Sequence, residues 1–378
     1  LSWNKNEDEP FETRNKLKYI EFGPRVTVVG NYDSGSDGEN QLFNDCDNVE
    51  KYYFYGDEQS LGTEVTFYCS EGMSDAPAAY ISRDLKASKY TEYTESGTGW
   101  GICDRLQEVY YGPFATYVTE KMYRGYGAAS NAYLTTVSFK EATRLTTVRE
   151  SAFEDCDHLQ SDIDFSNTSL KTIEKGAFFD CFSLENVTFS PTLETIGKQA
   201  FQETKIKNIS LPGTLKRLGY KAFHDCDNAT TLSFSPGEGI VWCDMEDDRC
   251  NTFTSCGNLT SLYLGRDIYW SDESKKCASP FYDSYFTNVV IDDNVYHLGN
   301  FLFQHSNKLQ ALSIGKKVKE IPNECFNETK EIQSFILTDS KEPITLGNSC
   351  ANFKVRSLYM GRSIEDIENI PGGRVDDT

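Results

Sequence analysis

The chain has 378 residues, of which 38% are hydrophobic, and it carries a formal charge of −21 at pH 7 with an isoelectric point near 4.7. So acidic a chain is a poor partner for nucleic acid or for anionic membrane surfaces, because both need lysine and arginine to neutralise phosphate. No apolar run reaches the roughly 18 to 20 residues that span a bilayer, so the sequence predicts no transmembrane segment in this chain.

One sequence pattern recurs along the chain: L-x-x-V-x-F, then L-x-x-I, then x-x-x-A-F-x-x-C. An N-terminal extension, residues 1–16, precedes three degraded copies that begin at Leu17, Val49 and Leu106. Regular copies follow at intervals of 22 to 30 residues, beginning at Leu134, Leu159, Leu184, Ile206, Ala229, Leu259, Phe286, Leu309, Ile332 and Val355. We therefore expect one repeat domain, residues 17–378, of about thirteen coils, with an insertion near 56–103 and enlarged coils near 237–280.

The spacing within each copy favours stacked strands. In L-x-x-V-x-F the last two apolar positions are two residues apart, which is the period of a strand with one buried face. One copy is too short to bury its own apolar side, so neighbouring copies have to share burial and strand hydrogen bonds. The pattern predicts a leucine-rich-repeat solenoid, of α/β or mainly-β type. A single parallel sheet should line one face, with short strands or helical turns on the back.

Cysteine recurs in one column of the repeat, after the A-F pair. The members are Cys46, Cys156, Cys181, Cys226 and Cys256. Serine or threonine fills the same column in other copies, so the column requires a small side chain, and we expect free, buried thiols there. Cys243 with Cys250, and Cys69 with Cys103, are better candidates for disulfides, and their state is left open by the sequence.

No motif for catalysis, metal binding or phosphate binding occurs in the chain. The four histidines are scattered, and two of them, His158 and His224, fall in expected turns. Acidic pairs such as Asp155 and Asp157 flank the column cysteines, where carboxylates favour turns. We therefore predict that the protein is not an enzyme and that it has no catalytic residue, metal site or cofactor.

Candidate binding residues are the large aromatic side chains expected on the open face of the sheet or on long loops, because such residues anchor many protein interfaces. The middle of the open face reads as small and hydroxyl-rich, for example at Asn208 and Ser210. Aromatic residues lie toward the ends and in the insertions: Tyr19, Tyr53, Tyr110, Tyr90, Tyr93, Trp100, Trp242 and Trp270. The N-terminal end is the predicted recognition surface; a competing interpretation is that the 56–103 segment only caps the array.

The x-x-I-x-x-x-A-F-x-x-C signature resembles the BspA-like class of leucine-rich repeats, over nearly all of residues 17 to 370. That resemblance implies a bacterial, host-associated protein at the cell surface or secreted, with any signal or anchor absent from this chain. It also implies an adhesion protein that binds a host or neighbouring-cell protein. The alternatives are a glycan-binding surface protein and a structural spacer. The motif residues are all core positions, so the resemblance carries over a fold and no binding site.

Overall fold

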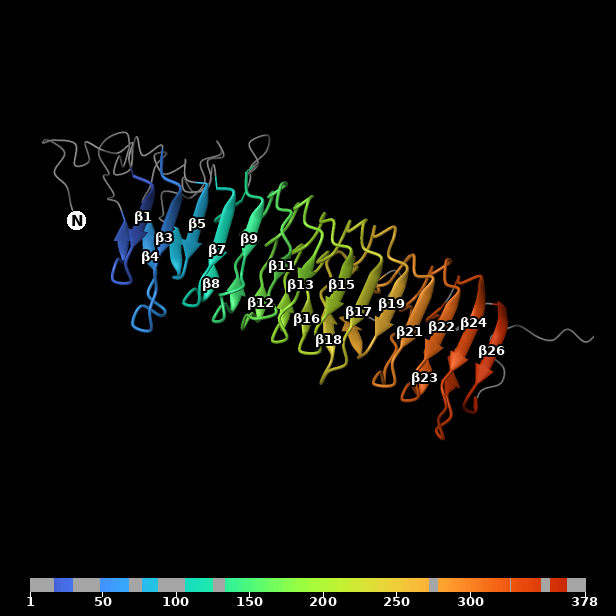
Figure 1. The fold of residues 1–378 in the computed structure, drawn as a ribbon. Helices are drawn as coiled ribbons and strands as arrows, with labels where there is room; N and C mark the ends of the chain where they lie inside the picture. The colour runs from blue at the N-terminus through green and yellow to red at the C-terminus, as the bar shows by residue number, and fades with distance from the viewer. Residues whose placement is uncertain are drawn as a thin grey trace, which may run out of the picture. The chain divides into compact units, whose positions relative to one another are not determined.

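The computed structural model describes residues 17–29, 48–67, 77–87, 106–124, 133–271, 278–326, 328–347 and 354–365 (Figure 1). These residues fall into two compact units, unit 1 within Leu1–Leu184 and unit 2 within Glu185–Thr378. Each unit is a β-solenoid in which every ladder between named strands is parallel, and no described residue is helical. The predicted leucine-rich-repeat solenoid, of the mainly-β type, is thus confirmed.

Unit 1 has a front sheet and a set of shorter strands behind it. In the front sheet, β1, β3, β5, β7 and β9 are hydrogen-bonded in that order, and β11 contacts β9. Behind it, β2, β4 and β6 pair in order, as do β8, β10 and β12. The front strands are β1 (Tyr19–Phe22), β3 (Lys51–Phe54), β5 (Ala78–Ile81), β7 (Glu108–Tyr111), β9 (Thr136–Ser138) and β11 (Ile163–Asp164). The others are β2 (Val28–Val29), β4 (Val65–Phe67), β6 (Leu85–Ala87), β8 (Tyr117–Val118), β10 (Thr147–Val148) and β12 (Thr172–Ile173).

Unit 2 repeats this plan. Its front sheet joins β15, β17, β19, β21, β22, β24 and β26 in order, with β13 in contact with β15. The front strands are β13 (Val187–Thr188), β15 (Asn208–Leu211), β17 (Thr231–Phe234), β19 (Ser261–Leu264), β21 (Asn288–Ile291), β22 (Ala311–Ile314), β24 (Glu331–Leu337) and β26 (Lys354–Met360). The strands behind them are β14 (Thr195–Ile196), β16 (Arg217–Leu218), β18 (Val241–Cys243), β20 (Ile268–Trp270), β23 (Glu320–Ile321) and β25 (Thr345–Leu346).

Apolar residues of the repeat line the core in unbroken columns. In unit 2, Ile209, Leu232 and Leu262 are direct register partners on successive front strands, and all are buried. Behind them the phenylalanines of the A-F positions stack from coil to coil, with ring centroids 5.1 to 5.9 Å apart. The stacked rings are Phe201, Phe223, Phe253, Phe281, Phe303 and Phe326. Side-chain alternation therefore places these residues as the repeat pattern predicts.

The turn around each A-F pair uses left-handed backbone. In unit 1, Ser151 has a φ of 55° and Asp155 a φ of 60°. Such conformations are unfavourable for most residues, and aspartate tolerates them because its short polar side chain bonds locally. The amides of both residues donate to carbonyls of the following coil, at Lys175 (3.0 Å) and Phe179 (2.9 Å). The acidic residues beside the column cysteines are thus turn formers, as the sequence favoured.

The segment near 56–103 corrects one prediction. It was expected to be an insertion, yet it contains β5, which pairs in register with β3 and with β7. Ala79 and Ile81 of this strand and Leu85 behind it are buried. Part of the segment is therefore a coil of the array. Within the described parts of the chain, no helix is long and apolar enough to cross a membrane.

Candidate binding surface

The open face of the unit 1 front sheet carries a cluster of five tyrosines. Tyr53, Tyr80 and Tyr110 are register partners on β3, β5 and β7, one strand apart. They point outward because the residues on either side of each, such as Tyr52 and Phe54, point into the core. Tyr19 on β1 and Tyr55 just after β3 complete the group. We call Tyr19, Tyr53, Tyr55, Tyr80 and Tyr110 the tyrosine cluster.

Four rings of the tyrosine cluster, those of Tyr19, Tyr53, Tyr55 and Tyr80, contact one another. Tyr53 stacks on Tyr55 with ring centroids 5.7 Å apart, and both lie 6.2 Å from the ring of Tyr80. Tyr19 meets Tyr53 edge-on at 6.3 Å. Tyr19 is 53% exposed and Tyr55 36% exposed, while the other three are half-buried. Mutual packing limits the rotamers of these rings, so a partner binding here would lose little side-chain entropy.

Carboxylates hold the phenol groups in place. Tyr110 donates a hydrogen bond of 2.7 Å to Glu108, and Tyr19 donates one of 3.1 Å to Glu50. These bonds are the largest cause of the raised pKa values of both tyrosines. Tyr80 donates to Glu141 at 3.3 Å, and burial is the main reason that its pKa is raised. The cluster therefore keeps neutral, fixed hydroxyls with acidic groups beside them.

One lysine lies among these rings. The Nζ of Lys51 is 4.5 Å from the ring centroid of Tyr110 and 5.3 Å from that of Tyr53. The ammonium group reaches over Ala78, its register partner on β5, whose side chain is small. The surface already accommodates one cation on tyrosine faces, and it is flanked by glutamates, so it can receive further cationic groups.

The structure brings together three of the predicted binding residues, Tyr19, Tyr53 and Tyr110, on a single sheet. Tyr55 and Tyr80 of the cluster were missing from the prediction. Gly112 is needed beside Tyr80, because an added Cβ would lie 2.4 Å from the tyrosine Oη and 2.6 Å from the Oγ of Ser82. The predicted residues Tyr90, Tyr93 and Trp100 lie outside the described residues.

The two tryptophans predicted on loops lie on strands instead. Trp242 on β18 points outward and is 47% exposed, with its ring 5.8 Å from that of Tyr269 on β20. Trp270, the next residue after Tyr269, points inward and is 2% exposed. Strand alternation thus buries Trp270, and its assignment as a binding residue was wrong. Its ring packs against Gly299, where a Cβ would lie 2.2 Å from it.

The front sheet of unit 2 presents small polar groups over its first strands, as predicted. The Oγ1 of Thr231 donates to the side chain of Asn208 at 2.7 Å, and Ser233 donates to Ser210 at 3.2 Å. These side chains form hydrogen bonds with one another between coils. This part of the sheet presents no large aromatic side chain, so it offers a partner fewer anchoring contacts than the tyrosine cluster does.

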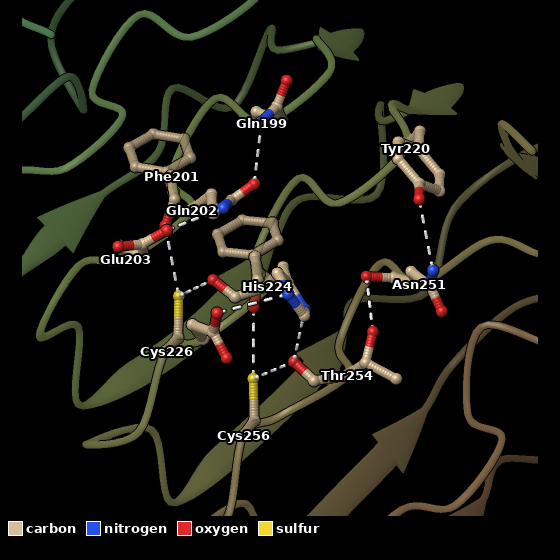
Figure 2. A network of polar contacts seen from close by, with 12 residues as sticks. Gln199, Phe201, Gln202, Glu203, Tyr220, His224, Cys226, Asn251, Thr254 and Cys256 are labelled. Atoms are coloured by element: carbon tan, nitrogen blue, oxygen red, sulfur yellow. Dashed lines mark hydrogen bonds and ion pairs between the residues drawn. The ribbon is translucent and has the colours of Figure 1, made fainter. Parts of the chain in front are cut away.

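The column cysteines act as hydrogen-bond donors inside the turns. The Sγ of Cys226 lies 3.2 Å from the carbonyl oxygen of Phe201 in the preceding coil, and the Sγ of Cys256 lies 3.1 Å from that of Phe223 (Figure 2). In unit 1, Cys181 donates in the same way to Phe153, at 3.1 Å. Serine and threonine can also donate hydrogen bonds, which explains why all three residue types occupy this column.

The described cysteines are free thiols. This confirms the prediction for Cys156, Cys181, Cys226 and Cys256, and it leaves Cys243 and Cys250 as two separate buried thiols. Burial raises the pKa values of Cys181 and Cys243. Protonated thiols are poor nucleophiles and poor metal ligands, so their role is in packing and hydrogen bonding. Cys46, Cys69 and Cys103 lie outside the described residues.

In the described ranges, His224 and Asp225 bond within the turns of the repeat. The Nδ1 of His224 is 3.0 Å from the carbonyl oxygen of Thr254, and its Nε2 is 3.2 Å from Asp225 (Figure 2). The thiol of Cys226 contacts His224 at its backbone carbonyl oxygen, 4.0 Å away. No group of three or more His, Cys, Asp or Glu side chains in the described ranges is arranged to hold a metal ion.

Comparison with known families gives one match. The sequence profile described as "BspA type Leucine rich repeat region" matches six copies over residues 125–236 and 275–370, more than half of the chain. No curated protein matches the chain.

The solved structures that align with this chain include proteins from bacteria. A leucine-rich repeat protein from Bacteroides ovatus aligns with a TM-score of 0.51 and 18% identity, covering 90% of this chain and 79% of that one. The pneumococcal vaccine antigen PcpA aligns with a TM-score of 0.31 and 17% identity, covering 93% and 84%. A leucine-rich cell surface protein from Faecalibacterium prausnitzii aligns with a TM-score of 0.25 and 14% identity, covering 77% and 84%. The first of these supports the fold alone.

Proposed function

Because the chain belongs to the BspA-type leucine-rich repeat family, we propose that it is a non-catalytic recognition protein that adheres to a protein of a host or neighbouring cell. Proteins of this family are repeat scaffolds, and the core residues of this chain stack its coils on one another. Its cell-surface or secreted location belongs to the same proposal, which rests on the family. Twelve cysteines and four histidines occur in the chain, and those described here serve packing or turns.

The observation that carries this proposal is the tyrosine cluster. Tyrosine offers a large contact area with few rotatable bonds, and it is enriched among the residues that dominate binding energy. Here four of the five rings contact at least one other ring on a parallel sheet, with Tyr53 in contact with the other three, and Lys51 lies over the rings of both Tyr53 and Tyr110. A flat sheet face suits a protein surface better than a small molecule, which generally needs a concave site.

The charges around the cluster indicate what the partner should offer. Glu108 and Glu50 already bind cluster hydroxyls, and Lys51 shows that a cation can lie over these rings. A partner surface with arginine or lysine would place aliphatic stems on the tyrosines and charged ends near the glutamates. The formal charge of −21 would increase the rate of encounter with such a basic surface.

The test is binding to a panel of purified extracellular-matrix proteins, namely fibronectin, laminin and collagen, measured by biolayer interferometry. For whichever matrix protein binds, Tyr53→Ala and Tyr80→Ala should each lower the affinity by about tenfold or more. Tyr296→Ala is the matched control, since Tyr296 is 58% exposed in unit 2 and lies outside the cluster. It should leave the affinity unchanged.

Thermal melting of each variant separates a binding effect from a folding effect. If Tyr53→Ala and Tyr80→Ala melt earlier and bind normally, the cluster is a packing feature and the proposal fails. Binding only to glycans on an array would favour the glycan-binding alternative. Binding to none of the matrix proteins or glycans would favour a spacer.

A further inference from the structure

A groove of about 470 Å³ crosses unit 2 where successive coils enter the front sheet. Its lining residues lie at or near the strands β19 to β24, which Figure 1 labels. Thr260, Thr287 and Gln310 directly precede β19, β21 and β22, and Gln333 lies in β24. The amide of each of the last three donates to the carbonyl oxygen of the one before it, at 2.8 Å. Four coils thus present one column of polar side chains with the strand spacing of about 4.8 Å.

Several polar side chains of the groove have no hydrogen-bond partner within the described ranges. Some exposed lysines of unit 2 pair with a carboxylate on a neighbouring coil, as Lys316 does with Asp293 at 2.9 Å and Lys216 with Glu194 at 2.8 Å. Five exposed polar side chains of the groove make no hydrogen bond or ion pair with any described residue. They are Asn307, Lys308, Gln310, Lys330 and Gln333.

The charge of the groove is opposite to that of the chain. Its two lysines, Lys308 and Lys330, are unpaired within the described ranges. Its one carboxylate, Glu331, is bound by Arg356 of the adjacent strand β26. In a chain of net charge −21 this leaves a local excess of positive charge. An anionic ligand is therefore favoured here over a cationic or neutral one.

The remaining lining groups match hydroxyls. The amides of Asn307, Gln310 and Gln333 each offer a donor and an acceptor, which a sugar hydroxyl can use together. Tyr285, the one aromatic residue of the lining, is 43% exposed and offers a ring for the apolar face of a sugar. Leu309 is the only lining residue with an aliphatic hydrocarbon side chain, and it is 2% exposed. The groove therefore has no apolar pocket to hold a peptide side chain.

We propose that this groove binds an anionic saccharide, with the sugar carboxylate at Lys308 and Lys330 and the hydroxyls at the three amides. The volume lies within the range of small-ligand sites, about 300–1,000 Å³. The site is in unit 2 and shares no residue with the tyrosine cluster of unit 1, so this inference and the proposed function stand or fall separately.

Two sources of such a carboxylate, uronic acids and sialic acids, are distinguished by the choice of probe. Isothermal titration uses trigalacturonate and 3′-sialyllactose, each beside its neutral counterpart, methyl-esterified trigalacturonate and lactose. One acidic probe should bind at least about tenfold more tightly than its neutral counterpart. That affinity should fall as salt rises, because the lysines are exposed. The probe that binds identifies the source.

The double variant Lys308→Gln with Lys330→Gln should weaken that binding by about tenfold, and Gln310→Ala with Gln333→Ala by a similar factor. Lys341→Gln, an exposed lysine of unit 2 outside the groove, is the matched control and should change it less than about twofold. Unaltered affinity in both double variants overturns the site. Equal binding of neutral probes, or of a hexaglutamate peptide, overturns the ligand class. Failure of both acidic probes to bind at millimolar concentration overturns the proposal as a whole.

Discussion

Arg266 and Asp267 are adjacent in the chain, but Arg266 bonds to preceding coils and Asp267 to the following coil. The guanidinium of Arg266, 2% exposed, donates to the carbonyl oxygens of Gly213 and Glu238 in the turns that follow the two preceding front strands. A carboxylate oxygen of Asp267 accepts from the amide of Tyr296 in the following coil, at 2.7 Å. The pair thus ties together four successive coils.

The same arrangement occurs in unit 1. Arg83 donates to the carbonyl oxygens of Val26 and Thr63, and Asp84 accepts from the amide of Thr116 at 2.6 Å. In both units the arginine lies two residues after the end of a front strand. A buried arginine with backbone carbonyls as partners is therefore a recurrent part of this solenoid.

Arg266→Met should destabilise unit 2 by about 2–4 kcal/mol, because it removes the buried guanidinium that donates to the carbonyl oxygens of Gly213 and Glu238. Urea titration followed by far-ultraviolet circular dichroism measures this loss. The matched control is Arg217→Met, which removes a 62% exposed guanidinium and its ion pair with Asp244. It should cost no more than about 1 kcal/mol. Equal losses would show that the buried arginine has no special role.

Phe223→Ala should cost about 3–5 kcal/mol, the range for truncating a buried phenylalanine. Its ring is fully buried between those of Phe201 and Phe253, at 5.3 and 5.7 Å, and the cavity would open on both sides. Ser210→Ala, on the open face, should stay within about 0.5 kcal/mol. The same urea titration compares them. A small loss for Phe223→Ala would contradict the stacked core.

Cys226→Ser should change stability by about 1 kcal/mol or less, because the hydroxyl can donate to the carbonyl of Phe201 in place of the thiol. Cys226→Leu fills the same fully buried position with a larger side chain and removes the donor. It should cost at least about 1–3 kcal/mol through overpacking. Thermal melting ranks the two. Better tolerance of leucine than of serine would exclude a hydrogen-bonding role for the column.

Thiol labelling gives an independent check of the cysteine column. In native protein at pH 8, Cys156, Cys181 and Cys226 should resist 5,5′-dithiobis(2-nitrobenzoate), because all three are buried and burial raises the pKa of the Cys181 thiol. After unfolding in guanidinium chloride without reductant, all three should react. Mass spectrometry that finds any of them in a disulfide would refute the assignment.

Asp155→Asn should make the protein more stable at neutral pH. Burial and the nearby Glu154 raise the pKa of Asp155 to about 6, above its usual value of 3.8. Between pH 3.8 and about pH 6, Asp155 is therefore still protonated in the folded state but ionised in the unfolded state. The contribution of this group to the free energy of unfolding is lost as pH rises from about 4 to about 6. Asparagine mimics the protonated form and tolerates the left-handed backbone.

The gain from Asp155→Asn should be about 1 kcal/mol at pH 7, after allowing for solvent screening of a half-buried carboxyl. Melting temperatures measured from pH 3.5 to pH 8 give the profile. The difference between variant and parent should be widest above pH 6 and close to zero near pH 3.5. A constant difference across this range would show that ionisation of Asp155 is not the cause.

The repeat pattern predicted the strands wherever its apolar positions were intact. Val137, Ile209 and Leu232 are buried at the expected places because period-two alternation admits only one inward set. The strand β5 was missed because Ala79 stands where other copies have a larger apolar residue. Its outward neighbour Tyr80 therefore fell within the expected insertion near 56–103, and the centre of the tyrosine cluster was missed with it.

Other features depend on three-dimensional contacts that a single sequence does not display. Trp270 was assigned to a loop because the enlarged coil breaks the spacing, although the run Ile268, Tyr269, Trp270 alternates as a strand. Arg83 and Arg266 look like ordinary polar turn residues. Their burial follows from carbonyl groups two coils away in the stack, at sequence separations of 57 and 53 residues.

The chemistry of the cysteine column also bears on the surroundings in which the protein can keep its shape. Cys181 and Cys226 hold adjacent coils through weak S–H donors, and no sulfur–sulfur bond is part of those contacts. Such contacts have no reduction potential to match against glutathione or oxygen. The described coils should therefore pack identically in an oxygen-rich medium and in a strongly reducing, anaerobic one.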